Sequence, residues 1–207
     1  MTASASSQNY PFGPFGFEFA PSSQHDAELV QNLGFVPGLK ELLMVRQVHA
    51  LEHATVWVLS EQDAAVRSQP NAEEYGGMST EQGFYLYGRV DTLAIRRAAQ
   101  VALERLTNGE WNLAVHPRCG TNLSVGMLLT AGLAAGMTLV LPKDPFGQLM
   151  GFGLAAMAGA SLAPDMGQLA QRFVTTAIPF NLEIVNVVEK GDRWGHPVHF
   201  VNVRWVQ

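Results

Sequence analysis

The chain has 207 residues, a formal net charge of −5 and charged side chains at only 15% of positions, against about 25% in ordinary soluble domains. Its 13 Lys and Arg residues form no basic run, so nucleic acid is not an expected partner. The single cysteine, Cys119, excludes an internal disulfide framework and leaves this thiol for a reducing compartment or a metal ion.

The first predicted elements are a tail and a long helix. The first 17 residues carry no charge, and Ser, Pro, Gly and Phe dominate the first 24, which predicts a disordered tail over residues 1–30 and is not typical of a signal peptide. After Pro37-Gly38, apolar side chains recur at spacings of three and four, which predicts a helix to about Leu59. Residues 60–77 are polar, end in two glycines and predict a loop.

Two short strands and one helix are predicted next. The aromatic run at 84–87 lies between glycines and predicts a strand. Asp91 stands where an N-cap belongs, ahead of a helical pattern that should close with a left-handed C-cap at Asn108-Gly109. Residues 111–115 predict a second strand, which would place His116 at its end.

Two adjacent stretches, 119–142 and 145–164, contain no charged residue. Each can form a helix of about 19 residues, or roughly 28 Å, which matches the thickness of a bilayer's hydrocarbon core, about 30 Å. The alternative is a soluble domain with two buried core helices. The two stretches are joined by a short tip, Pro142-Lys-Asp-Pro145. Because such a pair is unusual in a small soluble domain, we expect a transmembrane helical hairpin over 123–164. All Lys and Arg except Lys143 lie outside the tip, so the positive-inside rule predicts that the folded domain and both termini are cytoplasmic.

Glycines predict where the two helices of this hairpin approach each other. Gly132 and Gly136 lie four residues apart in the first stretch, as do Gly147 and Gly151 in the second. Such spacing lets helix backbones come close together in lipid.

The C-terminal segment predicts a β-hairpin, with strands at 182–188 and 198–206 and a turn at 190–192. The expected fold class is therefore α+β: a small mixed helix and short-strand domain over 34–122, interrupted by the transmembrane hairpin. Residues 165–207 should pack back on the first part of the domain.

The string His49-Ala-Leu-Glu52-His53 predicts half of a metal site. Helical residues four apart have Cβ atoms about 5–6 Å apart, so both imidazoles can reach one ion. Glu52 lies on the same face and could contact a water molecule on that ion. The alternative is a buried histidine and a surface histidine beside an ordinary Glu.

The string His116-Pro-Arg-Cys119-Gly predicts the other half, a tight knuckle that pairs an imidazole with the thiol. The alternative is a buried Cys and a His that only ends a strand. Neutral imidazole and thiolate are ligands that zinc selects.

We therefore predict one zinc ion per chain, with four ligands: His49, His53, His116 and Cys119. Another pair, His196 and His199, is interpreted as ordinary surface residues, because strand positions three apart point to opposite faces.

The motifs also carry a resemblance to known sequences. The order H-x-x-E-H-A-T, G-F-Y-L-Y-G and H-P-x-C-G-T-N, within residues 34–125, is similar to an uncharacterised, mainly cyanobacterial family with a domain of unknown function. A wider family of bacterial membrane proteins shows a similar pairing of H-x-x-E-H with H-P-R-C-G-T. The resemblance implies membrane association and a shared site, but no reaction. That site would comprise His49, Glu52, His53, His116 and Cys119.

Two functions fit these predictions. Four ligands would close the site, and the protein would be a membrane-anchored zinc module that serves as a scaffold or assembly factor for membrane proteins; we favour this interpretation. Three ligands would leave an open position, and the protein would be a membrane-surface, zinc-dependent hydrolase of peptidase type with Glu52 as general base. In both cases the expected partners are the lipid bilayer and other membrane proteins.

Overall fold

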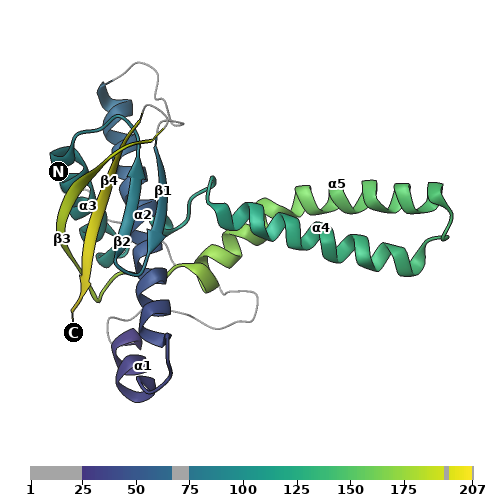
Figure 1. Cartoon of the computed structure of the whole chain (residues 1–207), viewed down its shortest axis with the longest axis horizontal. Helices are drawn as coiled ribbons and strands as arrows, with labels where there is room; N and C mark the ends of the chain where they lie inside the picture. The colour runs from purple at the N-terminus through teal and green to yellow at the C-terminus, as the bar shows by residue number, and fades with distance from the viewer. Residues whose placement is uncertain (1–24, 67–74, 194–195, 207) are drawn as a thin grey trace, which may run out of the picture.

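The protein is described here from a computed structural model that covers residues 25–66, 75–193 and 196–206. A mixed helix and sheet domain carries two long apolar helices that project from one side as a hairpin (Figure 1). The α+β class is confirmed. Residues 1–24 of the predicted tail lie outside the described residues. The end of that range, 25–30, belongs instead to helix α1 (His25–Leu33), where Asp26 accepts a hydrogen bond from the buried amide of Gln47.

Helix α2 (Leu39–Val66) is the centre of the domain. It begins where the sequence predicts, but it continues past Leu59 into the segment expected to be a loop. The extension is held in part by an ion pair between Glu61 and Arg105 of the neighbouring helix. The side chains of α2 that are buried against the rest of the domain include Val48, Leu51, Ala54, Val58 and Leu59.

Four antiparallel strands form one sheet in the order β1-β2-β4-β3, with bounds Gly76–Thr80 (β1), Gly83–Tyr87 (β2), Leu182–Arg193 (β3) and His196–Trp205 (β4). The predicted strand at 84–87 and the C-terminal hairpin are confirmed, whereas β1 begins inside the predicted loop. The turn predicted at 190–192 is wrong, because β3 continues through these residues after a register shift between Glu189 and Gly191.

His199 is not the surface residue that the sequence indicated. It is buried, on strand β4 between β2 and β3. The side chain of His196, the other member of this pair, lies outside the described residues.

The strand predicted at 111–115 is also wrong. Residues Trp111–Ala114 form the 3₁₀-helix η1. The amides of Leu113 and Val115 donate to carbonyls three residues earlier, and the carbonyls of Ala114 and Val115 accept from side chains of α2, so the segment pairs with none of the four strands described above.

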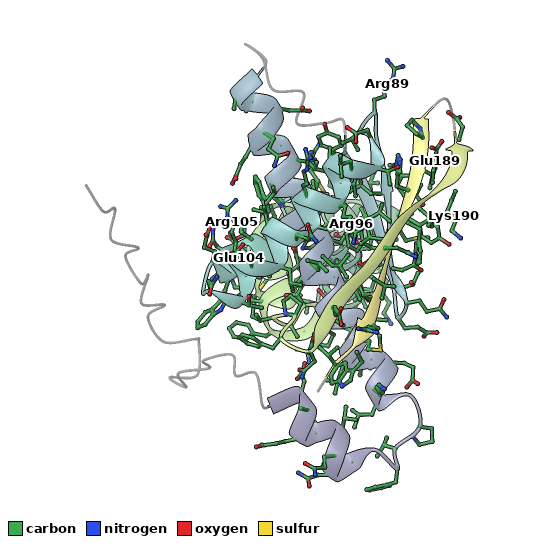
Figure 2. The ribbon with its side chains drawn as sticks, turned by 90° about the vertical axis from the view of Figure 1, so that its left-hand side faces the viewer. Arg89, Arg96, Glu104, Arg105, Glu189 and Lys190 are labelled. Carbon is green, nitrogen blue, oxygen red and sulfur yellow. The ribbon has the colours of Figure 1, made fainter. Side chains whose placement is uncertain are left out.

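Helix α3 (Thr92–Thr107) confirms both predicted caps. The Asp91 carboxylate accepts hydrogen bonds from two amides of the first turn, and Gly109 follows the last turn with a φ of 105°. One face of α3 packs on α2 and β3. The outer face carries charged side chains, seen in Figure 2 on the side of the domain away from the hairpin: Arg96, Glu104 and Arg105.

The hairpin consists of helix α4 (Gly120–Val140) and helix α5 (Pro145–Ala170), which continues into a π-helical segment, η2 (Gln171–Thr175). Both helices are long enough and apolar enough to cross a membrane. Most of their large side chains are exposed, so they are not the buried core helices of the soluble alternative.

The glycines that bring these helices together are not all the predicted ones. A Cβ added at Gly132 or Gly136 would meet no atom within 4 Å. A Cβ added at Gly151, Gly159 or Gly167 would lie within 2.8 Å or less of a side chain of α4 or its C-cap. The contact therefore follows small residues at four-residue intervals along α5, since Ala155 is buried in the same row and Ala163 lies against Gly126 of α4.

Candidate metal centre

Three donor groups from two distant parts of the sequence meet at the junction of domain and hairpin. His49 and His53 lie one turn apart on α2, and their ring centroids are 4.3 Å apart. Cys119, the N-cap of α4, supplies the third group. One ligand atom from each residue lies within 4.8 Å of the other two, so these three side chains could hold a metal ion.

The hydrogen bonds of both histidines orient them as ligands. The Nδ1 atom of His49 is 3.0 Å from the carbonyl oxygen of Thr175, and that of His53 is 2.7 Å from the carbonyl oxygen of Ala114. A carbonyl oxygen only accepts, so each Nδ1 donates, and each Nε2 is left as the ring atom that could bind a metal. Backbone carbonyls commonly hold metal-binding histidines in this way.

The distance between the sulfur and one of these nitrogens fits a tetrahedral site. Cys119 Sγ lies 3.3 Å from His49 Nε2. Zinc bonds of about 2.0–2.1 Å to nitrogen and 2.3 Å to sulfur would place two such ligands about 3.5 Å apart. The spacing of this pair therefore fits zinc, and His53 completes a group whose three ligand atoms lie within 4.8 Å of one another.

The surroundings of Cys119 favour its thiolate form. Burial raises the pKa of the thiol, but hydrogen bonding and charge from His53, together with hydrogen bonds from Thr121, outweigh it and leave the pKa below its ordinary value. The backbone N–H of Thr121 donates to Sγ at the N-terminus of α4, where the helix dipole also stabilises negative charge. The thiolate is the form that binds metal.

Glu52 lies in the same cleft but outside the group of three donors. It is buried, and the hydroxyl of Ser79 on β1 donates to its carboxylate. Burial raises the pKa of Glu52, although the hydrogen bond from Ser79 and the charge of His49 act in the opposite direction. A carboxyl group with a raised pKa is suited to exchanging protons at neutral pH.

The backbone of β1 lies close against Glu52 because the residue at that point of the strand, Gly77, has no side chain. A Cβ at Gly77 would lie 2.2 Å from Glu52 Oε1. Neither β1 nor its role was predicted from the sequence. The Gly76-Gly77 pair was the available signal, because glycine in a strand often marks a close approach of the backbone.

His116 lies beside the donors. Its ring centroid is 5.7 Å from that of His53, and its Nδ1 accepts a hydrogen bond from the amide of Arg118 at 3.3 Å. Burial, assisted by the charges of His53 and Arg118, lowers the pKa of His116 to about 4. The imidazole is therefore neutral at pH 7, with its proton on Nε2. His116 is not among the three grouped donors, and its role as a fourth ligand stays a prediction.

Gln171 joins the knuckle to the end of the hairpin. Its role was not predicted from the sequence. Its side chain is fully buried; it accepts from the amide of His116 and donates to Asn122, both at 2.8 Å. The first turn of η2 places it there, and η2 also presents the Thr175 carbonyl to His49. A polar residue at the end of an apolar helix gives no sequence signal for such a contact.

The donors line a cleft of about 400 Å³ between α2, β1 and the knuckle. Glu52 and His116 line it too, and the remaining walls include Val45, Val56, Tyr75, Met78, Arg118 and Gly120. The cleft therefore brings together the five residues singled out from the sequence.

Comparison with known proteins identifies the family. Residues 44–187 match the model of a family described as a domain of unknown function, DUF6391. The chain belongs to this family. It is also 53% identical over 192 residues to an uncharacterised protein of the cyanobacterium Picosynechococcus sp., across 90% of this chain and 92% of that protein. No solved structure matches it. The predicted resemblance to a cyanobacterial family of unknown function is confirmed, and the matched range of this DUF6391 chain contains the whole donor group.

Proposed function

We propose that this protein is a membrane-anchored metallohydrolase of peptidase type, with zinc held by His49, His53 and Cys119. One observation supports this choice over the scaffold: three grouped donors share an open cleft with a buried carboxyl group. Three protein ligands leave a fourth position for water or substrate, as is usual at catalytic zinc sites.

The metal and two residues beside it would have separate roles in hydrolysis. Bound zinc would polarise the scissile carbonyl and lower the pKa of a water molecule. Glu52 would accept a proton from the attacking water and pass it to the leaving amine, and its raised pKa suits both steps. His116, neutral and protonated on Nε2, would donate a hydrogen bond to the oxygen that gains negative charge.

The hairpin supports a location at the membrane surface. Cys119 caps α4, and the exposed apolar surface begins at Leu123, about 6 Å further along the helix. If α4 and α5 cross the bilayer, the cleft meets protein segments that leave the membrane.

We propose that the domain and both termini face the cytoplasm. A reporter fused after Gln207 tests this: activity only outside the cytoplasm would reverse the orientation, and extraction by alkaline carbonate would reject membrane insertion.

Metal analysis of the full chain, purified in detergent without a metal-affinity tag, tests the site. We expect about one zinc per chain in the wild type and its loss in His53→Ala and Cys119→Ala, with destabilisation of the domain. Wild-type protein with less than about 0.2 equivalents, unchanged in both variants, would reject the metal site.

Two further variants separate the hydrolase from the scaffold. Glu52→Gln should keep zinc and fold but lose hydrolysis of a fluorogenic mixture of randomised dodecapeptides, because an amide cannot accept the proton. His116→Ala should keep zinc if the site is open and lose it if His116 closes the site. A fully metallated and fully active Glu52→Gln protein would remove the hydrolase proposal.

A further inference from the structure

Strand β1 is an edge of the sheet, and it borders the cleft. We propose that its free edge binds an extended polypeptide as an additional antiparallel or parallel strand, and that this pairing carries a peptide bond to the donor group. The inference rests on the proposed function and names its substrate class, an unfolded segment of a polypeptide. Within the described residues, no other strand pairs with this edge.

The register of the sheet shows which main-chain groups point outward. The carbonyl of Gln82 accepts from Val203, and the amide of Gly88 donates to Pro197, so even-numbered residues of β2 face β4. The odd-numbered residues of β2 therefore face β1, because main-chain groups alternate between the two sides of a strand.

The same alternation applies to β1. Its residues opposite the odd-numbered residues of β2 are Gly76, Met78 and Thr80, whose main-chain groups face β2. The N–H and C=O groups of Gly77 and Ser79 consequently point to the free edge. Two alternate residues offer donors and acceptors in the spacing that one added strand requires.

The sequence of β1 leaves this edge open. Natural sheets protect their edges with charged residues, proline or a covering element, because an exposed edge pairs with other chains. Residues Gly76–Thr80 contain neither charge nor proline, and Gly76, Gly77 and Met78 are exposed. An unprotected edge beside a cleft with catalytic chemistry is the arrangement expected of a peptide-binding strand.

The edge lies directly against the general base. Gly77 has no side chain to separate its backbone from Glu52, and Ser79 donates its hydroxyl to the same carboxylate. A strand paired with these two residues would run along the cleft beside Glu52. Hydrolysis then needs only water: a C–O bond forms, the peptide C–N bond breaks, and the proton taken from water goes to the amine.

Recognition by main-chain pairing selects peptides over lipid esters. A strand edge binds a repeating series of N–H and C=O groups, which lipids lack. The location beside the hairpin brings membrane-anchored polypeptides within reach, as membrane proteins present such segments where they leave the bilayer.

Hydrogen exchange of individual amides tests the pairing. Zinc-loaded Glu52→Gln protein in detergent would be mixed with randomised dodecapeptides, and exchange followed by NMR. Exchange at Gly77 and Ser79 should slow by about tenfold or more, because new hydrogen bonds protect these amides. Met78 and Thr80, already paired with β2, should not change. The same peptides with every amide N-methylated should have no effect, since they cannot donate to the outward carbonyls of β1 and their methyl groups prevent the close approach of a paired strand.

A matched pair of variants isolates one main-chain group. Ser79→Pro removes the outward N–H, which an edge strand tolerates, together with the hydroxyl. Ser79→Ala removes only the hydroxyl. In an otherwise wild-type chain, Ser79→Pro should raise the KM for the peptide mixture at least about tenfold relative to Ser79→Ala, with similar zinc content and melting temperature.

The outcomes separate the two proposals. Protection of Gly77 and Ser79 without any hydrolysis would keep the edge as a binding site and reject the hydrolase. Hydrolysis without this protection, or equal KM values for the two Ser79 variants, would overturn the edge inference and leave the hydrolase. Equal binding of N-methylated peptides would also overturn it.

Discussion

Helices α3 and α4 differ in where their apolar side chains lie: those of α3 are largely buried in the domain, and those of α4 are largely exposed. α3 carries charged residues on its outer face and buries a row of apolar ones against the domain: Ile95, Ala98, Ala99, Ala102 and Leu106. α4 has no charged residue, yet Ala134 is its one buried residue. Its exposed apolar side chains include Leu123, Met127, Leu128, Leu139 and Val140.

An apolar composition and burial inside the protein are therefore separate properties in this chain. An amphipathic helix such as α3 obtains its apolar surroundings from the protein itself. The α4–α5 hairpin is apolar on nearly all sides and, within the described parts of the chain, joins the domain at its base (Figure 1). Its surface is therefore suited to an apolar solvent, which a bilayer provides.

The largest effect is expected from a matched truncation of two leucines. Leu106→Ala removes a fully buried side chain of α3 and should lower the free energy of unfolding of the domain by about 2–5 kcal/mol. Leu128→Ala on the exposed surface of α4 should change it by about 0.5 kcal/mol or less. Urea unfolding in detergent, followed by tryptophan fluorescence, measures the domain, because all four tryptophans lie outside the hairpin. If both variants lost the same free energy of unfolding, the contrast between a buried α3 face and an exposed α4 surface would be contradicted.

Placing a charge on each helix should reverse the order of these effects. Leu128→Arg should disfavour insertion by about 2.5–3.5 kcal/mol if α4 crosses the bilayer, because arginine near the middle of a span is costly. Leu93→Arg, at an exposed position of α3, should be tolerated. The fraction of each variant that stays in carbonate-washed membranes is the measurement. Normal retention of Leu128→Arg would argue that α4 does not span the bilayer.

Glycine substitutions test the packing within the hairpin. A Cβ at Gly159 would lie 2.1 Å from the Thr130 hydroxyl and 3.1 Å from its Cα, so Gly159→Ala should cost about 1–3 kcal/mol. Gly132→Ala meets nothing within 4 Å and serves as control. Thermal unfolding followed by circular dichroism in detergent should show the loss in Gly159→Ala only. The reverse result would mean that the predicted glycine pair forms the contact.

The smallest effect on stability is expected at the site. Gly77→Ala should cost about 1 kcal/mol, since the whole side chain of Glu52, whose Cγ the new Cβ would approach to 2.6 Å, has to turn away. That movement should nevertheless lower kcat by about 100-fold, the usual result of misplacing a catalytic group by 1 Å. Gly76→Ala, whose Cβ would meet only Tyr87 at 4.0 Å, should stay active. Similar activities of the two variants would separate Glu52 from catalysis.

Local signals in the sequence predicted the elements that depend on neighbouring residues. Asp91 and Gly109 mark the two ends of α3, and both caps form as expected. The histidines of α2 lie on one face because helical periodicity alone places them there. The two apolar stretches were likewise predicted from length and composition.

Predictions failed where a residue depends on distant partners. Residues 111–115 have the composition of a strand, but side chains of the distant helix α2 donate to the carbonyls of Ala114 and Val115, and none of the four described strands pairs with them. Lys190 and its neighbours have the composition of a turn, yet β4 continues to pair with that part of β3. Gly132 and Gly136 have the spacing of a helix contact, but the helix rotates them away from its partner.

Spacing along the chain identifies the groups that could form a site: two imidazoles one turn apart, a carboxylate between them, and a thiol paired with a third imidazole. Their arrangement in space depends on the fold. The fold grouped His49 and His53 with Cys119, tied His116 to Gln171, and placed the edge of β1 over Glu52. The physical reason is that spacing along one helix fixes short-range geometry, whereas contacts between α2, β1 and the hairpin arise from packing across the whole chain.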